Sequence, residues 1–120
     1  MKALPIVLSA ALLAAPAAAQ VAPAPQFTLE HRMLLRCSAA FALVAYRQGT
    51  GDGEAAQYPP LKERGSEYFV RASARVMEEA GLDRTAVTAA LQEEARTLLQ
   101  GGTLTAVMPV CLSALEAAGL

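Results

Sequence analysis

The chain is poor in the residues from which most metal and redox centres are built. Among its 120 residues there are one histidine, two cysteines and no tryptophan. A zinc site uses a set of cysteines and histidines, covalent haem attachment uses C-x-x-C-H, and a thiol redox centre usually has C-x-x-C spacing. None of these patterns occurs. We therefore expect no cofactor, no metal centre and no enzyme.

The single histidine, His31, lies among charged residues at the polar start of a predicted helix. A histidine that acts as a base needs a nucleophile and an orienting partner, and no motif identifies either. Met33 follows it and would suit copper, but residues two positions apart on a helix point in different directions. We expect His31 to be a solvated side chain.

The chain also lacks an excess of charge of either sign. Ten basic and 11 acidic residues give a formal net charge of −1. Proteins that bind nucleic acid, or that adhere electrostatically to membrane surfaces, carry basic patches. The balance therefore predicts no nucleic-acid partner and no polybasic attachment to a membrane.

The most apolar stretch stands at the N-terminus and has the organisation of a secretory signal peptide. Lys2 precedes an apolar run over 3–15, and Ala17 and Ala19 provide the small residues before a cleavage site. Cleavage between Ala19 and Gln20 would remove 19 of the 120 residues and leave 101.

Other features of this N-terminus refine the predicted location. The apolar run is short for a membrane span of about 20 residues. Neither a twin arginine nor a cysteine for lipid attachment lies near the cleavage site. The short signal and the many alanines are typical of bacteria. We expect a periplasmic or secreted bacterial protein with no membrane anchor after cleavage.

The rest of the chain has helical periodicity and no sustained β alternation. A short extended leader over 20–26 precedes a single domain over 27–120. Glycines and prolines divide this domain into helices over about 28–48, 60–80, 84–99 and 104–118. The sequence predicts an all-α fold, a small four-helix bundle.

Several residues indicate where these helices begin and end. Pro60 suits the first position of the second helix, Gly81 is a stop signal, and Asp83 is an N-cap for the third helix. Pro109 must kink or begin the last helix. We expect a short turn over 103–107 and the main helix from Pro109.

Two glycine features have alternative interpretations. Gly65 within the second helix indicates either close helix packing or a later helix start. The stretch GTGDG over 49–53 resembles a phosphate-binding loop, but such loops follow a strand and this one follows a helix. We interpret it as a flexible surface linker.

The two cysteines, Cys37 and Cys111, fall in the first and last predicted helices. An even number of cysteines in an exported protein predicts a disulfide. A bond closing about 75 residues would contribute about 4.5 kcal/mol by restricting the unfolded chain. We therefore predict that this disulfide joins the two ends of a thin core.

The first helix is apolar on nearly all sides through its middle. One stripe contains Met33, Cys37, Phe41 and Val44, and a second contains Leu35, Ala39, Ala42 and Tyr46. A surface helix usually has one apolar stripe. Either the other helices surround this one, or the second stripe is an interface with a partner or a second copy. We favour the interface.

Three aromatic residues lie near the second helix: Tyr58, Tyr68 and Phe69. They could rim a ligand pocket or complete the core, and we favour the core.

The leading hypothesis is an exported, non-enzymatic, disulfide-stapled protein that acts through protein contacts, as a homodimer or with a partner. Its role would be an interaction in the cell envelope or that of a stress-type protein. The alternative is a carrier of a small apolar ligand in a cavity between helices.

Overall fold

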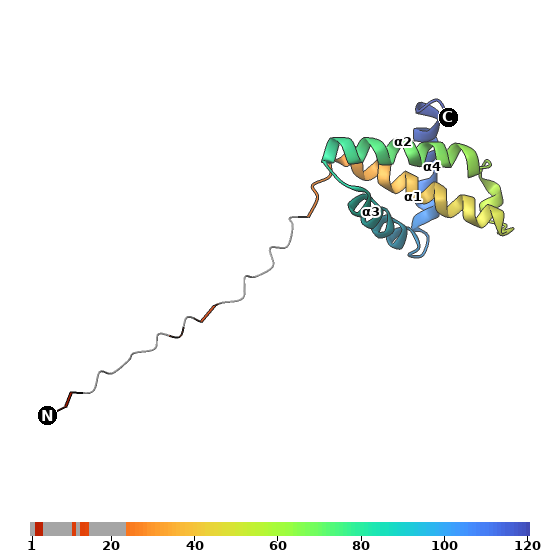
Figure 1. Cartoon of the computed structure of the whole chain (residues 1–120). Coiled ribbons are helices and arrows are strands. Elements are labelled where there is room, and N and C mark those ends of the chain that lie inside the picture. Colours follow the sequence, from red (N-terminus) through yellow and green to blue (C-terminus); the bar gives the residue numbers. More distant parts are fainter. Residues whose placement is uncertain (1, 4–10, 12, 15–23) are drawn as a thin grey trace.

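The computed structural model describes residues 2–3, 11, 13–14 and 24–120. This part of the chain contains four α-helices and no strand. The helices are α1 (Leu29–Gly49), α2 (Lys62–Ala80), α3 (Arg84–Leu98) and α4 (Thr103–Ala117), with a short 3₁₀ helix η1 (Ala55–Gln57) after α1 (Figure 1). The predicted all-α fold with four helices is confirmed. The predicted cleavage site between Ala19 and Gln20 lies outside the described residues, as does most of the predicted signal peptide, 1–19.

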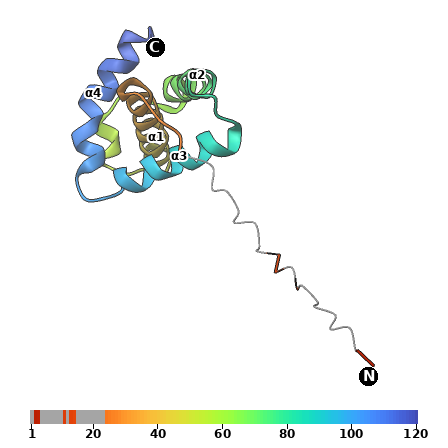
Figure 2. The same ribbon diagram turned by 90° about the vertical axis from the view of Figure 1, so that its left-hand side faces the viewer.

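The four helices are not arranged as equals, because α1 lies at the centre. It packs most extensively against α2 and also against α3 and α4, whereas these three outer helices contact one another only at a few points. Figure 2 shows α1 between α4, α2 and α3. A helix that is covered on several sides needs several apolar sides. Central burial therefore explains the apolar middle of α1, and the interpretation that we had favoured, a free second stripe, is wrong for Leu35 and Ala39, which are buried.

The main core lies between α1, α4 and the adjoining residues of α2. Phe41 and Val44 of α1 and Met108 and Leu115 of α4 are almost completely buried there. A smaller cluster of Leu35 with neighbours from α2 and α3 lies toward the other end of α1. Large side chains therefore fill the side of the central helix that faces α4 and the neighbouring part of α2.

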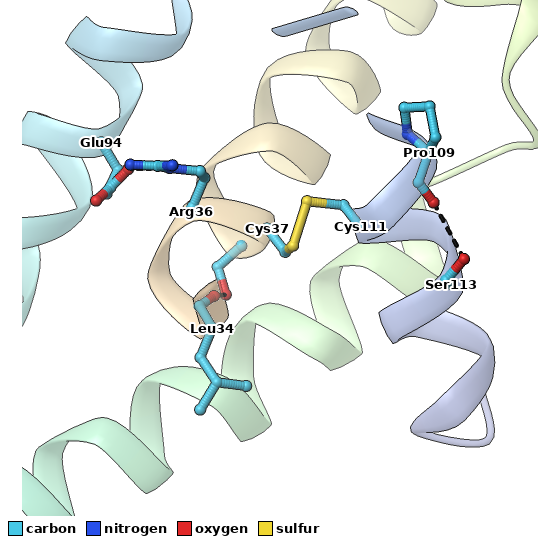
Figure 3. Close-up of a disulfide and its surroundings, with 8 residues drawn as sticks. Leu34, Arg36, Cys37, Glu94, Pro109, Cys111 and Ser113 are labelled. Atoms are coloured by element: carbon cyan, nitrogen blue, oxygen red, sulfur yellow. Dashed lines mark hydrogen bonds and ion pairs between the residues drawn. A yellow bond between two sulfur atoms is a disulfide. The ribbon is translucent and has the colours of Figure 1, made fainter. Parts of the chain in front are cut away.

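The predicted disulfide is present and joins the first and last helices. Cys37 and Cys111 are fully buried, and their Cα atoms are 5.2 Å apart. The neighbouring residue Arg36 reaches in another direction, where its guanidinium lies 3.0 Å from the carboxylate of Glu94 on α3 (Figure 3). Two consecutive residues of α1 therefore hold α4 and α3 by different chemistry.

The second part of the loop between α1 and α2 is held by one side chain at the end of α1, that of Gln48. The Gln48 amide donates to the carbonyl oxygens of Ala55 at 3.1 Å and Pro59 at 2.9 Å, and its oxygen accepts from the backbone N–H of Leu61 at 3.1 Å. Because the backbone N–H of Leu61 is held in this way, α2 begins at Lys62. The predicted start at Pro60 is wrong by two residues. Gln48 had no visible role in the sequence.

The glycine and cap signals around α2 and α3 are confirmed. Gly81 ends α2 in the left-handed region with φ 66°, and the Asp83 carboxylate accepts from the N–H of Ala86 at 2.8 Å. A Cβ on Gly65 would lie 3.0 Å from the Cβ of Phe41. Gly65 is therefore a site of close packing between α2 and α1.

The expected break at Pro109 does not occur, and α4 is one helix from Thr103 to Ala117. A proline leaves the carbonyl four residues earlier, here that of Thr105, without its helical N–H partner. Both Pro109 and Thr105 are exposed on the outer side of α4, where solvent can reach that carbonyl. The exposure explains why the helix continues through the proline.

Candidate binding groove between α1, α2 and α3

An apolar groove of about 730 Å³ lies between α1, α2 and α3. Most of its lining is apolar and comes from all three helices: Ala39, Ala42, Leu43, Phe69, Val70, Ala74, Met77, Val87, Leu91 and Ala95. α2 and α3 meet at the turn over 81–83 and diverge from there (Figure 1). The groove occupies the wedge between these two helices, and α1 forms its floor.

Small side chains on α1 keep this wedge open. Ala39 and Ala42 lie one turn apart and present only methyl groups to the groove. Ala39 is buried by its neighbours, whereas Ala42 is exposed. On the opposite side of α1, the corresponding space is filled by Phe41, Val44 and the disulfide. The groove therefore exists because α1 has alanines where larger residues would have filled the wedge.

The wall formed by α2 is the most exposed apolar part of the groove. Val70 is 63% exposed and Phe69 is half-buried beside it. Both residues, together with Ala42, also line a second hollow of about 150 Å³ that continues toward Gly65. The apolar surface therefore extends past Phe69 along the seam between α1 and α2.

The polar residues of the groove lie in two places. Arg84, Thr88 and Gln92 are spaced by four residues and form one edge along α3, and Ser73 lies on α2. No acidic residue lines the groove. Arg84 is exposed and forms no ion pair within the described part of the chain. The groove therefore has a single charge, which is positive and stands at one end.

Ser73 differs from the other helical serines in its hydrogen bonding. Ser38 and Ser113 donate to the carbonyl oxygens of Leu34 at 2.7 Å and Pro109 at 3.2 Å, each four residues earlier. The Ser73 hydroxyl oxygen is buried and has no partner among residues 24–120. An unpartnered buried hydroxyl costs free energy in the empty protein.

The predicted interface stripe is divided between different environments. Leu35 is 2% exposed and packs with Val76 of α2 and Val87 of α3, so it belongs to the core. Ala39 is also buried, Ala42 forms the groove floor, and Tyr46 is 72% exposed near the end of α1. Because α2 and α3 cover the first half of the stripe, the four residues do not form one surface. Only Ala42 and Tyr46 are accessible.

The three aromatic residues predicted for the core have separate positions. Tyr68 is buried and meets Phe41 edge-on, with ring centroids 5.1 Å apart. Tyr58 is half-buried against the main core beneath the loop. Phe69 forms part of the groove wall. The core prediction is thus confirmed for Tyr68, whereas Phe69 takes the pocket position that we had not favoured.

His31 is buried, so the prediction that its side chain is solvated is wrong. Its Nδ1 accepts from the backbone N–H of Thr28 at 3.4 Å, while the Thr28 hydroxyl accepts from the His31 N–H at 3.1 Å. These reciprocal bonds cap α1. The other ring nitrogen lies 3.7 Å from Glu79 at the end of α2. Packing of α2 beside the start of α1 covers the ring, which therefore has a structural role.

Charged residues surround this cap. Arg75 lies 2.7 Å from Glu30 and 2.8 Å from Glu79. The hydrogen bond and charge of Arg75, with a smaller contribution from His31, lower the pKa of the Glu79 carboxyl. Arg75 and Glu79 are an i,i+4 pair along α2, as are Glu67 and Arg71, whose atoms lie 2.8 Å apart. These ion pairs lie outside the groove lining.

Within the described residues, no group of three or more histidine, cysteine, aspartate or glutamate side chains has a geometry that could hold a metal ion. No helix in the same part of the chain combines the length and apolar character needed to cross a membrane. No family model, curated protein or solved structure matches the chain.

Proposed function

We propose that this protein is an exported, non-enzymatic binding protein that recognises a helix of a partner protein in the groove between α1, α2 and α3. The groove is the observation that carries the proposal. Within residues 24–120 no helix covers α1 along this groove, and apolar side chains from three helices converge on it. Contiguous exposed apolar surface of this kind marks an interaction site.

The dimensions of the groove suit one face of an α-helix. Its lining on α3 extends from residue 84 to residue 95, which is about 16 Å of helix or about three turns. An amphipathic helix binds in such grooves through apolar anchors at i, i+3, i+4 and i+7. The methyl groups of Ala39 and Ala42 leave room for large anchors such as leucine or phenylalanine. A bound helix would cover the remaining side of α1.

The proposed compartment is the bacterial periplasm or the medium. The disulfide between Cys37 and Cys111 is consistent with an oxidising compartment outside the cytoplasm. Residues 1–19 have the organisation of a secretory signal. Both features support an exported protein, in which partner binding would take place after removal of the signal.

A second candidate function is the carriage of a small apolar ligand. Its support is the volume of about 730 Å³, which lies within the range of about 300–1,000 Å³ of small-molecule sites. The two functions use the same groove and differ in the occupant.

Binding of a helical peptide to the mature protein tests the proposal. The probe is a fluorescent amphipathic peptide of about three turns with leucines at i, i+3, i+4 and i+7, followed by anisotropy. Ala42→Arg places a charged side chain on the groove floor and should weaken binding by at least about tenfold. Ala106→Arg is the matched control, because Ala106 is exposed on α4 and outside the groove.

The outcomes separate the two functions. Peptide binding that is retained by Ala106→Arg and lost in Ala42→Arg would support the partner-helix proposal. Equal binding by both variants would contradict it. Native mass spectrometry of the exported protein then tests the second candidate, since a carrier would retain a small additional mass that Ala42→Arg loses. A doubled mass lost in the same variant would identify the occupant as a second copy.

A further inference from the structure

We infer that the helix bound in the groove is acidic at one end, where its carboxylates lie beside Arg84. This inference rests on the proposed function and specifies the chemistry of the partner. Arg84 is the first residue of α3 and the only charged residue of the groove lining. The charge of the groove is therefore not spread along it but is concentrated at the end near the turn between α2 and α3.

Arg84 is available for a partner, unlike several other arginines of the domain. Arg36, Arg71, Arg75 and Arg96 each lie within 3.0 Å of a glutamate oxygen. Arg84 has neither an ion pair nor a side-chain hydrogen bond within the described residues. Its neighbour Asp83 is occupied, because its carboxylate caps α3 through the N–H of Ala86. A carboxylate of the bound helix would give Arg84 the ion-pair partner that the described residues do not provide.

The remaining polar groups limit where the partner can carry charge. Thr88 and Gln92 continue the same edge of α3 beyond Arg84, and both are uncharged. A helix lying along this edge would meet a cation at one end only and neutral hydrogen-bonding groups along the rest. A basic helix would place like charge beside Arg84, which is unfavourable. The matching ligand is thus amphipathic, apolar toward α1 and α2, and acidic beside the start of α3.

Charge-matched peptides test the inference. Three peptides share the leucine positions of the probe above and carry two glutamates, two glutamines or two lysines at the same end. The glutamate peptide should bind about threefold to tenfold more tightly than the glutamine peptide at low salt, and the lysine peptide more weakly. Added salt should reduce the difference, because Arg84 and its partner are exposed to solvent. Placing the charged pair at the other end of the peptide serves as a second set, so that either orientation of the helix is tested.

Substitutions at Arg84 assign the preference to this residue. Arg84→Gln should abolish the difference between glutamate and glutamine peptides, and Arg84→Glu should reverse the order so that the lysine peptide binds best. Arg32→Gln and Arg32→Glu are matched controls, because Arg32 is exposed on α1, outside the groove, and has no ion pair among the described residues. Both controls should retain the preference for glutamate.

The results distinguish failure of this inference from failure of the proposed function. If all three peptides bind equally in both sets and Ala42→Arg abolishes their binding, the groove binds helices but the charge preference is wrong. If no peptide binds, both proposals are overturned. A glutamate preference that persists in Arg84→Gln would also overturn the inference, since another residue would then be responsible.

Discussion

The two sides of α1 are both apolar in its middle but differ in the size of their side chains. On the side that faces α4 and the neighbouring part of α2, Phe41, Val44 and the disulfide are at most 1% exposed and fill the space between the helices. Toward α2 and α3, Ala39 and Ala42 leave a groove of about 730 Å³. An apolar pattern shows that a side avoids water, and the volume of its side chains decides whether the protein itself covers that side.

The same substitution on the two sides should have very different consequences. Ala40 is fully buried in the main core, so Ala40→Arg would force a charge into a filled space and should cost about 4 kcal/mol or more. Ala42 is exposed, and Ala42→Arg should change the free energy of unfolding by no more than about 0.5 kcal/mol. Thermal unfolding followed by circular dichroism measures both. Equal destabilisation would show that the groove is not an open surface.

Removal of the disulfide should have an effect of similar size, and it acts on the side of α1 that faces α4. The bond joins residues 74 positions apart, and its loss in Cys37→Ala/Cys111→Ala should lower the free energy of unfolding by about 4.5 kcal/mol. Urea unfolding of the oxidised wild type, the reduced wild type and the double variant provides the measurement. If reduction left the urea midpoint unchanged, the disulfide would not contribute to the stability of the packing between α1 and α4.

Gly65→Ala tests how tightly α1 and α2 pack around Phe41. The new Cβ would lie 3.0 Å from the Cβ of Phe41, and overpacking of this kind costs about 1–3 kcal/mol. The gain in helix propensity of about 1 kcal/mol offsets part of this, so we expect a net loss of about 1 kcal/mol. Gly49→Ala is the control, because Gly49 also lies in a helix and no atom lies within 4 Å of its added Cβ. It should be neutral or stabilising.

Features that depend on neighbouring residues could be predicted from the sequence. The end of α2 at Gly81 and the cap at Asp83 need only the residues around them, and both are confirmed. The pairing of Cys37 with Cys111 could be predicted because no other cysteine competes. The start of α2 could not, because it depends on the Gln48 side chain acting across the loop.

The groove could not be predicted because it depends on how the helices are placed in space. The sequence indicated that α1 is apolar on several sides, but not that α2 and α3 diverge from the turn over 81–83. That divergence divides the predicted stripe, burying Leu35 and leaving Ala42 in the groove. His31 was assigned to solvent for a related reason, since the packing of α2 and of Phe27 against the start of α1 covers it.

The last expected effect has the opposite sign and concerns Ser73, which lies on the α2 wall of the groove. Ser73→Ala removes a buried hydroxyl that has no hydrogen-bond partner within the described residues, so the free protein should gain up to about 1 kcal/mol in stability. In a domain of this size such a gain raises Tm by about 4–8 °C. Ser38→Ala is the control and should instead be destabilising, because its hydroxyl donates to the Leu34 carbonyl at 2.7 Å. If Ser73→Ala lowered Tm, the Ser73 hydroxyl would have a hydrogen-bond partner in solution, and the groove wall on α2 would have no unsatisfied polar group at this position.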